Sequence, residues 1–252
     1  MNISIALHEA RELMTLHELY RAEANCQLIR DSHWARGFLN CYSIAVDGRL
    51  AGHGAVTERY DKGRAHEFYV FPEFRESATE LFREFLKISG ATHVEAQSNL
   101  PLMMEMLKAF TTDICAEKFL FADGRTSRLT CAANGAFRRL RETGELPLFN
   151  QGNEPPGDWL IEAEGKIVAT GGFLTHYNPP YADLYMEVEP TQRRKGFGSY
   201  LIQEVKKVCY ESGKRPAARC DHLNAASRAA LEKAGMIVCG ELLVGTVIPK
   251  MY

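Results

Sequence analysis

The chain has 252 residues, of which 46% are hydrophobic and 25% charged, and its formal net charge is −2. This length suits one large domain or two of ordinary size, and the composition is that of a globular protein. The small net charge argues against a general attraction to nucleic acid or to anionic membranes.

The sequence also gives information on membrane insertion, secretion and the redox state of the cysteines. No apolar run approaches the roughly 18 residues that a membrane-spanning helix needs. The N-terminus carries acidic residues early and no basic region, so it is not typical of a signal peptide. The seven cysteines are scattered and odd in number, which favours free thiols in a reducing compartment. We therefore expect a cytoplasmic protein with neither a nucleic-acid nor a membrane partner.

The first half of the sequence predicts a hairpin, a strand and a helix. Residues 42–56 contain two strand patterns around Asp47-Gly48, a pair typical of tight hairpin turns. A further strand should end near Val70, before Pro72. The helix that follows should bury one face, made of Leu81, Phe82, Phe85 and Leu86. Residues 92–124 then predict a strand, a loop, a helix and a strand.

The second half repeats this order. Residues 158–174 predict a second hairpin around Glu164-Gly165, a strand should end near Val188, and Pro190 precedes a second amphipathic helix. That helix should bury Leu201, Ile202, Val205, Val208 and Cys209. A strand, a loop, a helix and a strand complete the copy. We therefore predict an α/β (α+β) fold of two similar mixed-sheet domains flanked by helices, residues 1–125 and 126–252. Coincidence between two generic βα units is the alternative, and residues 146–158 should form a loop.

A basic, glycine-containing stretch joins the strand ending at Val188 to the second helix. It consists of Arg193, Arg194, Lys195, Gly196, Phe197, Gly198 and Ser199. Unpaired N–H groups at a helix N-terminus attract anions, glycine lets an anion approach the backbone, and arginine can bind phosphate with two hydrogen bonds. The stretch predicts a diphosphate site, although its spacing fits neither a P-loop nor a dinucleotide fingerprint. A solvated basic turn is the alternative.

The stretch from Val188 to Gly198 resembles the acyl-CoA signature of the GNAT superfamily of N-acetyltransferases. That signature is Arg/Gln-x-x-Gly-x-Gly/Ala after a strand and a proline turn. The stretch from Asn224 to Met236 resembles the second signature of the family, at the usual separation. The resemblance covers residues 127–252. It implies an enzyme that transfers the acetyl group of acetyl-CoA to a primary amine by direct attack.

The resemblance also implies where acetyl-CoA would bind, namely between two parallel strands that splay apart. Backbone groups around Met186 and Val188 would hold the pantetheine arm, and an N–H near Val188 would polarise the thioester. Backbone amides of residues 194–199 would hold the pyrophosphate. Asn224 and Ser227 would contact the pantetheine or the end of the cofactor, although a helix-start role explains Ser227 equally well.

The first half resembles the same fold without this chemistry. Ala78 and Glu80 stand where the second half has Gly196 and Gly198. Because carboxylates at a helix start repel pyrophosphate, we expect the first copy to be degenerate and to bind no CoA.

The acid and base that many relatives use are missing. Leu231 stands where they have a tyrosine, and the place of their strand glutamate is close to Arg219. Strand alternation instead puts Asp183, Tyr185 and Glu187 on one face and Leu184, Met186 and Val188 on the other. We predict Glu187 as the base, with Asp183 second, and Tyr185 as the proton donor; purely structural polar residues are the alternative.

His222 is a further candidate base, because its ordinary pKa lies near neutrality. Cys220-Asp-His222 lacks a second ligand pair at zinc spacing, so we expect no metal. The aromatic residues Phe173, Tyr177, Tyr181 and Tyr185 could wall an acceptor pocket. Arg138, Arg139 and Arg141 predict a solvated helix face.

Three functions stay open at this point. The first is N-acetyl transfer to a small-molecule or peptide amine of undetermined identity. The second is non-catalytic binding or sensing of an acyl-CoA, favoured by Leu231 and the missing glutamate. The third is transfer from another acyl donor. Association into a homodimer is also open.

Overall fold

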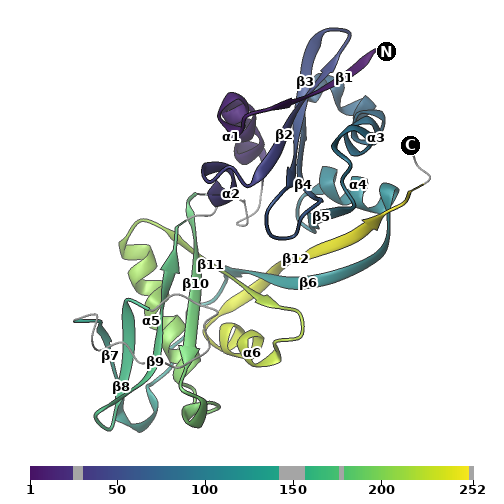
Figure 1. The fold of residues 1–252 in the computed structure, drawn as a ribbon. Coiled ribbons are helices and arrows are strands. Elements are labelled where there is room, and N and C mark those ends of the chain that lie inside the picture. The colour runs from purple at the N-terminus through teal and green to yellow at the C-terminus, as the bar shows by residue number, and fades with distance from the viewer. Residues whose placement is uncertain (25–30, 142–156, 176–178, 250–252) are drawn as a thin grey trace. The chain divides into compact units, whose positions relative to one another are not determined.

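The computed structural model describes residues 1–24, 31–141, 157–175 and 179–249. It divides into two compact units, shown in Figure 1: unit 1 comprises Met1–Glu117 and Gly240–Tyr252, and unit 2 comprises Lys118–Cys239. No helix in the described part of the chain is long and apolar enough to cross a membrane.

Unit 1 is a mixed sheet with helices. Its strands follow the order β1-β2-β3-β4-β5-β12, and all neighbours are antiparallel except β4 and β5. In chain order its elements are β1 (Ile3–His8), η1 (Ala10–Leu13), α1 (Met14–Glu23), α2 (Asp31–Ala35), β2 (Leu39–Val46), β3 (Arg49–Thr57), β4 (Arg64–Val70), η2 (Pro72–Ser77), α3 (Ala78–Ser89), β5 (His93–Gln97), α4 (Pro101–Phe110), the start of β6 (Thr111–Asp123) and most of β12 (Met236–Val247).

Unit 2 repeats this arrangement. Its strands follow the order β6-β11-β10-β9-β8-β7, with β10 and β11 as the parallel pair. The remaining elements are η3 (Ala132–Asn134), β7 (Ala136–Arg139), β8 (Trp159–Ala163), β9 (Lys166–Leu174), β10 (Tyr181–Val188), η5 (Pro190–Gln192), α5 (Phe197–Glu211), β11 (Arg215–Asp221) and α6 (Ala225–Lys233). Hairpin, strand, helix, strand, helix and strand therefore recur in the predicted order, and the predicted fold class is confirmed.

The closing strands depart from the order of the sequence. In unit 1, β5 pairs with β12, from Gln97 opposite Leu242 to His93 opposite Thr246. In unit 2, β11 pairs with β6, from Ala217 opposite Ala122 to Asp221 opposite Lys118. Each copy is thus completed by the last strand of the other. The compact units consequently differ from the predicted domains 1–125 and 126–252, because β12 pairs with β5 and the end of the chain therefore belongs to unit 1.

Each unit has its own apolar core. In unit 1, α3 buries the predicted face, with Leu81, Phe82, Phe85 and Leu86 all fully buried. In unit 2, α5 lies against β9 and β10 (Figure 1) and buries Leu201, Ile202, Val205 and Cys209, whereas Val208 is half-buried. The 3.6-residue periodicity of both helices therefore identified the faces that hold the cores.

One prediction about an arginine cluster is wrong. Arg138 and Arg139 lie in strand β7, not on a helix. The strand pairs with β8, and Arg138 Nε donates to Glu162 Oε2 at 2.8 Å. Pairing with β8, which is distant in the sequence, therefore makes this segment a strand, although the local spacing of its arginines suggested a helix. Residues 146–156 of the predicted loop 146–158 lie outside the described residues.

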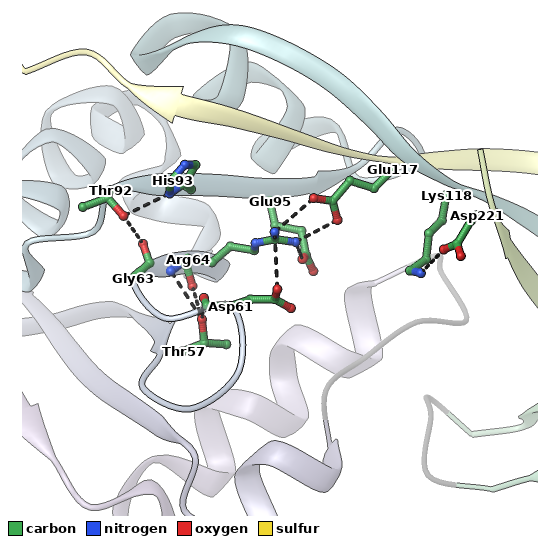
Figure 2. Close-up of polar contacts among 10 residues, drawn as sticks. All are labelled: Thr57, Asp61, Gly63, Arg64, Thr92, His93, Glu95, Glu117, Lys118 and Asp221. Atoms are coloured by element: carbon green, nitrogen blue, oxygen red, sulfur yellow. Dashed lines mark hydrogen bonds and ion pairs between the residues drawn. The ribbon is translucent and has the colours of Figure 1, made fainter. Parts of the chain in front are cut away.

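An ion-pair network fixes the start of β4 in unit 1 (Figure 2). Arg64 Nη1 donates to Glu95 Oε2 and to Glu117 Oε2, both at 2.9 Å, and Nη2 donates to Glu117 Oε1 at 3.0 Å. Asp61 Oδ1 lies 3.6 Å from Nη2. The side chains of Arg64 and Glu95 are 13% and 6% exposed, so water cannot easily replace either partner.

Replacing Arg64 by methionine is expected to destabilise unit 1 by about 3 kcal/mol, because a buried carboxylate loses its counter-ion. The measurement is urea unfolding followed by the fluorescence of Trp34 in a Trp159→Phe background, since the chain has two tryptophans and Trp34 belongs to unit 1. Lys62→Met removes an exposed pair with Glu58 in the same unit and should cost under about 1 kcal/mol. Equal effects of the two changes would contradict the prediction.

Candidate functional site

The parallel strands β10 and β11 separate soon after they begin. Their register joins Tyr181–Asp183 to Arg215–Ala217, and no later pair between them occurs in the described residues. Beyond that point β10 stays paired with β9 as far as Val188, and β11 stays paired with β6 as far as Asp221. The two strands thus present an opening between their C-terminal halves, next to the start of α5.

The turn before α5 is built for a ligand that approaches the backbone. Arg194 has φ +63° and Gly196, the N-cap of α5, has φ +92°. The first α5 bond involving Gly196 is from Tyr200 N to Gly196 O at 3.1 Å, and within the described chain no loop or cap bond uses the N–H groups of residues 194–199. Unpaired N–H groups at a helix start carry partial positive charge. The turn can therefore bind an anion such as a phosphate group.

Gly198 allows α5 to approach β10 closely. A Cβ at this position would stand 3.0 Å from Met186 Sδ and 3.3 Å from Val188 Cγ2. Met186 and Val188 therefore face α5, and alternation puts Asp183, Tyr185 and Glu187 on the opposite face, as predicted. The side chain of Phe197 is only 2% exposed and lies in the core of unit 2, so this residue can offer only its backbone to a ligand.

Four cations surround this turn. Arg193, Arg194 and Lys195 are exposed; Arg193 Nε donates to Val188 O at 3.3 Å, and Lys195 Nζ donates to Gln192 Oε1 at 2.8 Å. The fourth is Lys233 at the end of α6. Among the described residues, only its Nζ comes within 4 Å, at 3.9 Å, of where a Gly196 Cβ would stand. Sequence reasoning missed Lys233, because nothing in the spacing connects the end of α6 with the start of α5.

The polar residues on the other face of β10 differ in their surroundings. Asp183 forms an ion pair with Arg219, with 3.5 Å between Oδ2 and Nε. Glu187 Oε1 is buried and has no hydrogen-bond partner among the described residues. The hydroxyl of Tyr185 lies beside Gly172, 2.8 Å from where a Cβ on that glycine would stand. Of the two carboxylates, Glu187 is therefore the one whose buried oxygen can accept a proton without breaking a bond within the chain.

The residues predicted around α6 have local roles. Asn224 Oδ1 accepts a hydrogen bond from Ser227 N at 3.0 Å and caps the helix. The ring of His222 stacks on Phe119 at 4.3 Å and is exposed. Leu231 is 2% exposed and packs in the core. Of the predicted aromatic wall, Tyr177 lies outside the described residues.

Comparison with known proteins identifies the domain. The sequence model of the acetyltransferase (GNAT) family matches residues 127–236. Residues 127–236 are therefore similar to a GNAT acetyltransferase domain. GNAT proteins are acyltransferases, and the matched residues include the turn before α5 and the β10–β11 opening. A comparison with curated proteins finds no match.

Solved structures extend the GNAT fold to the whole chain. A GNAT-family acetyltransferase from Colwellia psychrerythraea is similar over 98% of this chain and 100% of its own, with a TM-score of 0.79 and 17% identity. A tandem GNAT protein from the clavulanic acid biosynthesis pathway is similar over 99% and 100%, with a TM-score of 0.63 and 13% identity. A GCN5-related N-acetyltransferase from Sphaerobacter thermophilus is similar over 98% and 96%, with a TM-score of 0.58 and 14% identity. At these identities the similarity concerns the fold alone.

The GNAT-like copy in unit 1 has the opening but not the turn. Its parallel strands β4 and β5 pair only from Arg64 and Ala65 to His93 and Val94, so they separate like β10 and β11. However, η2 runs directly into α3, and no residue between 71 and 89 has a positive φ. Glu80 lies in the first turn of α3. The unit therefore lacks the backbone geometry that Arg194 and Gly196 give the GNAT domain.

Proposed function

We propose that the chain is an acetyl-CoA-dependent N-acetyltransferase that acts on a primary amine through unit 2. The observation that carries this proposal is the left-handed turn at Arg194 and Gly196, which leaves N–H groups available at the start of α5, beside the β10–β11 opening. Such a turn is suited to a diphosphate. Acetyl-CoA supplies a diphosphate and an acyl group activated as a thioester.

The binding roles follow from the positions of the groups. Backbone N–H groups of residues 194–199 would donate hydrogen bonds to the pyrophosphate, and the charges of Arg193, Arg194, Lys195 and Lys233 would neutralise it. Backbone groups beside Met186 and Val188, on the open edge of β10, would hold the pantetheine arm. An N–H near Val188 would donate to the thioester carbonyl, where negative charge develops during attack. Asn224 and Ser227, at the start of α6, are proposed as further contacts.

Proton transfer is assigned to the polar face of β10. An ammonium ion has no lone pair, so the acceptor must lose a proton before it attacks. Glu187 is proposed as the base because its buried Oε1 has no partner among the described residues. Asp183 comes second, because Arg219 stabilises its charge. Tyr185 is proposed to protonate the departing thiolate, which can also leave unprotonated, since thiols ionise near neutral pH.

The acceptor is proposed to be a small-molecule or peptide amine. The described aromatic residues Phe173, Tyr181 and Tyr185 lie on β9 and β10 and are candidates for one wall of its pocket. A cytoplasmic location is proposed because Cys41, Cys115, Cys131, Cys209 and Cys220 form no disulfide. Cys26 lies outside the described residues.

Replacing Glu187 by glutamine is expected to lower kcat by roughly 10²- to 10⁴-fold, the usual contribution of a general base. The dissociation constant of acetyl-CoA should stay unchanged, because Glu187 lies on the face of β10 opposite α5. Calorimetry gives the binding constant, and a thiol-release assay with a panel of amines gives the rate. Asp183→Asn is the matched control. A rate loss confined to Asp183→Asn would assign the base to Asp183 instead.

A second function, non-catalytic binding of an acyl-CoA, is favoured by one observation. Leu231 stands at the position where many relatives use a tyrosine as the general acid. Its side chain is buried in the core and cannot donate a proton. This alternative predicts that the chain binds acetyl-CoA but releases no thiol with any amine in the panel. Glu187→Gln should then have no effect on the binding of acetyl-CoA. Running the panel with acetyl-CoA and with longer acyl-CoA donors also tests the third alternative, a different acyl group.

A further inference from the structure

Three side chains that commonly bind metals converge inside unit 1. His17 comes from α1, His53 from β3 and Glu67 from β4. His17 Nδ1 lies 2.9 Å and His53 Nε2 lies 2.6 Å from Glu67 Oε1, and the three ligand atoms all lie within 4.8 Å of one another. Their side chains are 1%, 0% and 1% exposed. Segments up to 50 residues apart in sequence thus bring these groups to one point in the core.

The surroundings of this cluster are dry and aromatic. Trp34 Nε1 donates to Glu67 Oε2 at 3.2 Å, and the Trp34 ring stacks on His17 at 4.3 Å between centroids. The rings of Tyr20 and Tyr69 lie 6.4 and 5.9 Å from that of His53. The second oxygen of the carboxylate is therefore fixed by an indole N–H, and Oε1 is left to face the two imidazoles.

Charge balance singles out Glu67. Among the described residues, no lysine or arginine forms an ion pair with Glu67. An ionised carboxylate in a dry core is costly unless a positive charge accompanies it.

We propose that unit 1 binds one divalent transition-metal ion, Zn²⁺ in the first place, through His17 Nδ1, His53 Nε2 and the carboxylate of Glu67. Two imidazole nitrogens and one carboxylate are a ligand set that zinc accepts, and a cation there would lie next to a carboxylate that has no lysine or arginine partner among the described residues. Metal–ligand bonds of about 2.0–2.2 Å require Glu67 Oε1 to move away from the two imidazole nitrogens, which lie 2.9 and 2.6 Å from it. The hydrogen bond from Trp34 is of the kind that orients metal-binding carboxylates.

The site would be structural. Its ligands are almost completely buried, which does not suit a site that must admit a substrate. A metal there would tie α1 to the neighbouring strands β3 and β4. The site lies wholly in unit 1 and is independent of the proposed acyl transfer.

The test uses the full chain, freed of metal with a chelator and titrated with Co²⁺. We expect one equivalent to bind and to give the visible absorption of Co²⁺ held by nitrogen and oxygen ligands, and Zn²⁺ to displace it. Zn²⁺ should also raise the unfolding temperature of unit 1, because a ligand that binds only the folded state stabilises it. In a Trp159→Phe background, Co²⁺ should quench Trp34, which contacts His17.

The controls separate this site from chance binding by surface histidines. His53→Gln should abolish the Co²⁺ absorption, whereas His93→Gln should leave it intact; His93 belongs to the same unit but its Nδ1 contacts Thr92 Oγ1 instead. If His53→Gln does not fold, Trp34→Phe keeps all three ligands and should weaken binding by about 10-fold or more. Failure of the wild-type chain to bind Co²⁺ and Zn²⁺ would overturn the proposal, as would unchanged binding in His53→Gln. The cluster would then be a hydrogen-bonded network only.

Discussion

Replacing Gly196 by glutamate is expected to weaken acetyl-CoA binding by roughly 10- to 100-fold or more, since charge-assisted hydrogen bonds are worth about 1.5–3 kcal/mol each. The substitution acts in two ways. Gly196 has φ +92°, a backbone conformation that other residues adopt only with strain, so the turn must change shape. The new carboxylate would also stand at the start of α5, where it repels a pyrophosphate. Calorimetric titration with acetyl-CoA measures the effect.

The matched control is Gly213→Glu, in the same unit. Gly213 has φ +71° and open space around its Cβ position, so the change introduces a similar backbone strain and the same charge. It follows the C-terminus of α5 instead of preceding the N-terminus. Binding should survive in Gly213→Glu. If both variants bind like the wild type, the turn at Gly196 does not hold the pyrophosphate, and the proposed enzymatic function loses its main support.

Ending the chain at Cys239 is expected to unfold unit 1 or to destabilise it by about 5 kcal/mol or more. The change removes the part of β12 that pairs with β5. It also removes three buried side chains, those of Leu242, Val244 and Val247, each worth about 1.5–3 kcal/mol on full burial. The fluorescence of Trp34, which is 4% exposed, reports the unfolding of unit 1 in a Trp159→Phe background.

A chain ending at Pro249 is the control, because it keeps all of β12 and should unfold like the full chain. A second reporter, Trp159 in a Trp34→Phe background, follows unit 2, where Trp159 stacks on Phe137 at 4.9 Å. Unit 2 keeps Met236–Cys239 of β12 and should be affected less. An unchanged midpoint for Trp34 would show that β12 is not needed to complete the sheet of unit 1.

Local chemistry explains why the sequence was informative about the elements. The Asp47-Gly48 and Glu164-Gly165 pairs predicted two hairpins, and all four residues have positive φ, as tight hairpin turns require. The helical periodicity of α3 and α5 predicted which faces are buried. The basic turn with Gly196 and Gly198 was visible because helix starts bind anions through a short continuous segment. These features depend on residues close together in the chain.

Strand partners were beyond the reach of the same reasoning. Alternation along β6 and β12 fixes which side chains share a face, but many strands of similar pattern could lie beside them. The exchange of these two closing strands is therefore a property of the tertiary structure, and so is strand β7, which took Arg138 out of the predicted helix.

In the two candidate sites, too, some features follow from the local sequence and others only from the tertiary structure. The sequence by itself determined the repeat, its elements and the basic turn proposed to bind an anion, because turn chemistry and periodicity act within a few residues. Only the tertiary structure decided that Lys233 joins the turn, that Glu187 keeps a buried oxygen without a partner among the described residues, and that His17, His53 and Glu67 meet. These groups are brought together by packing between segments distant in sequence, which no local spacing records.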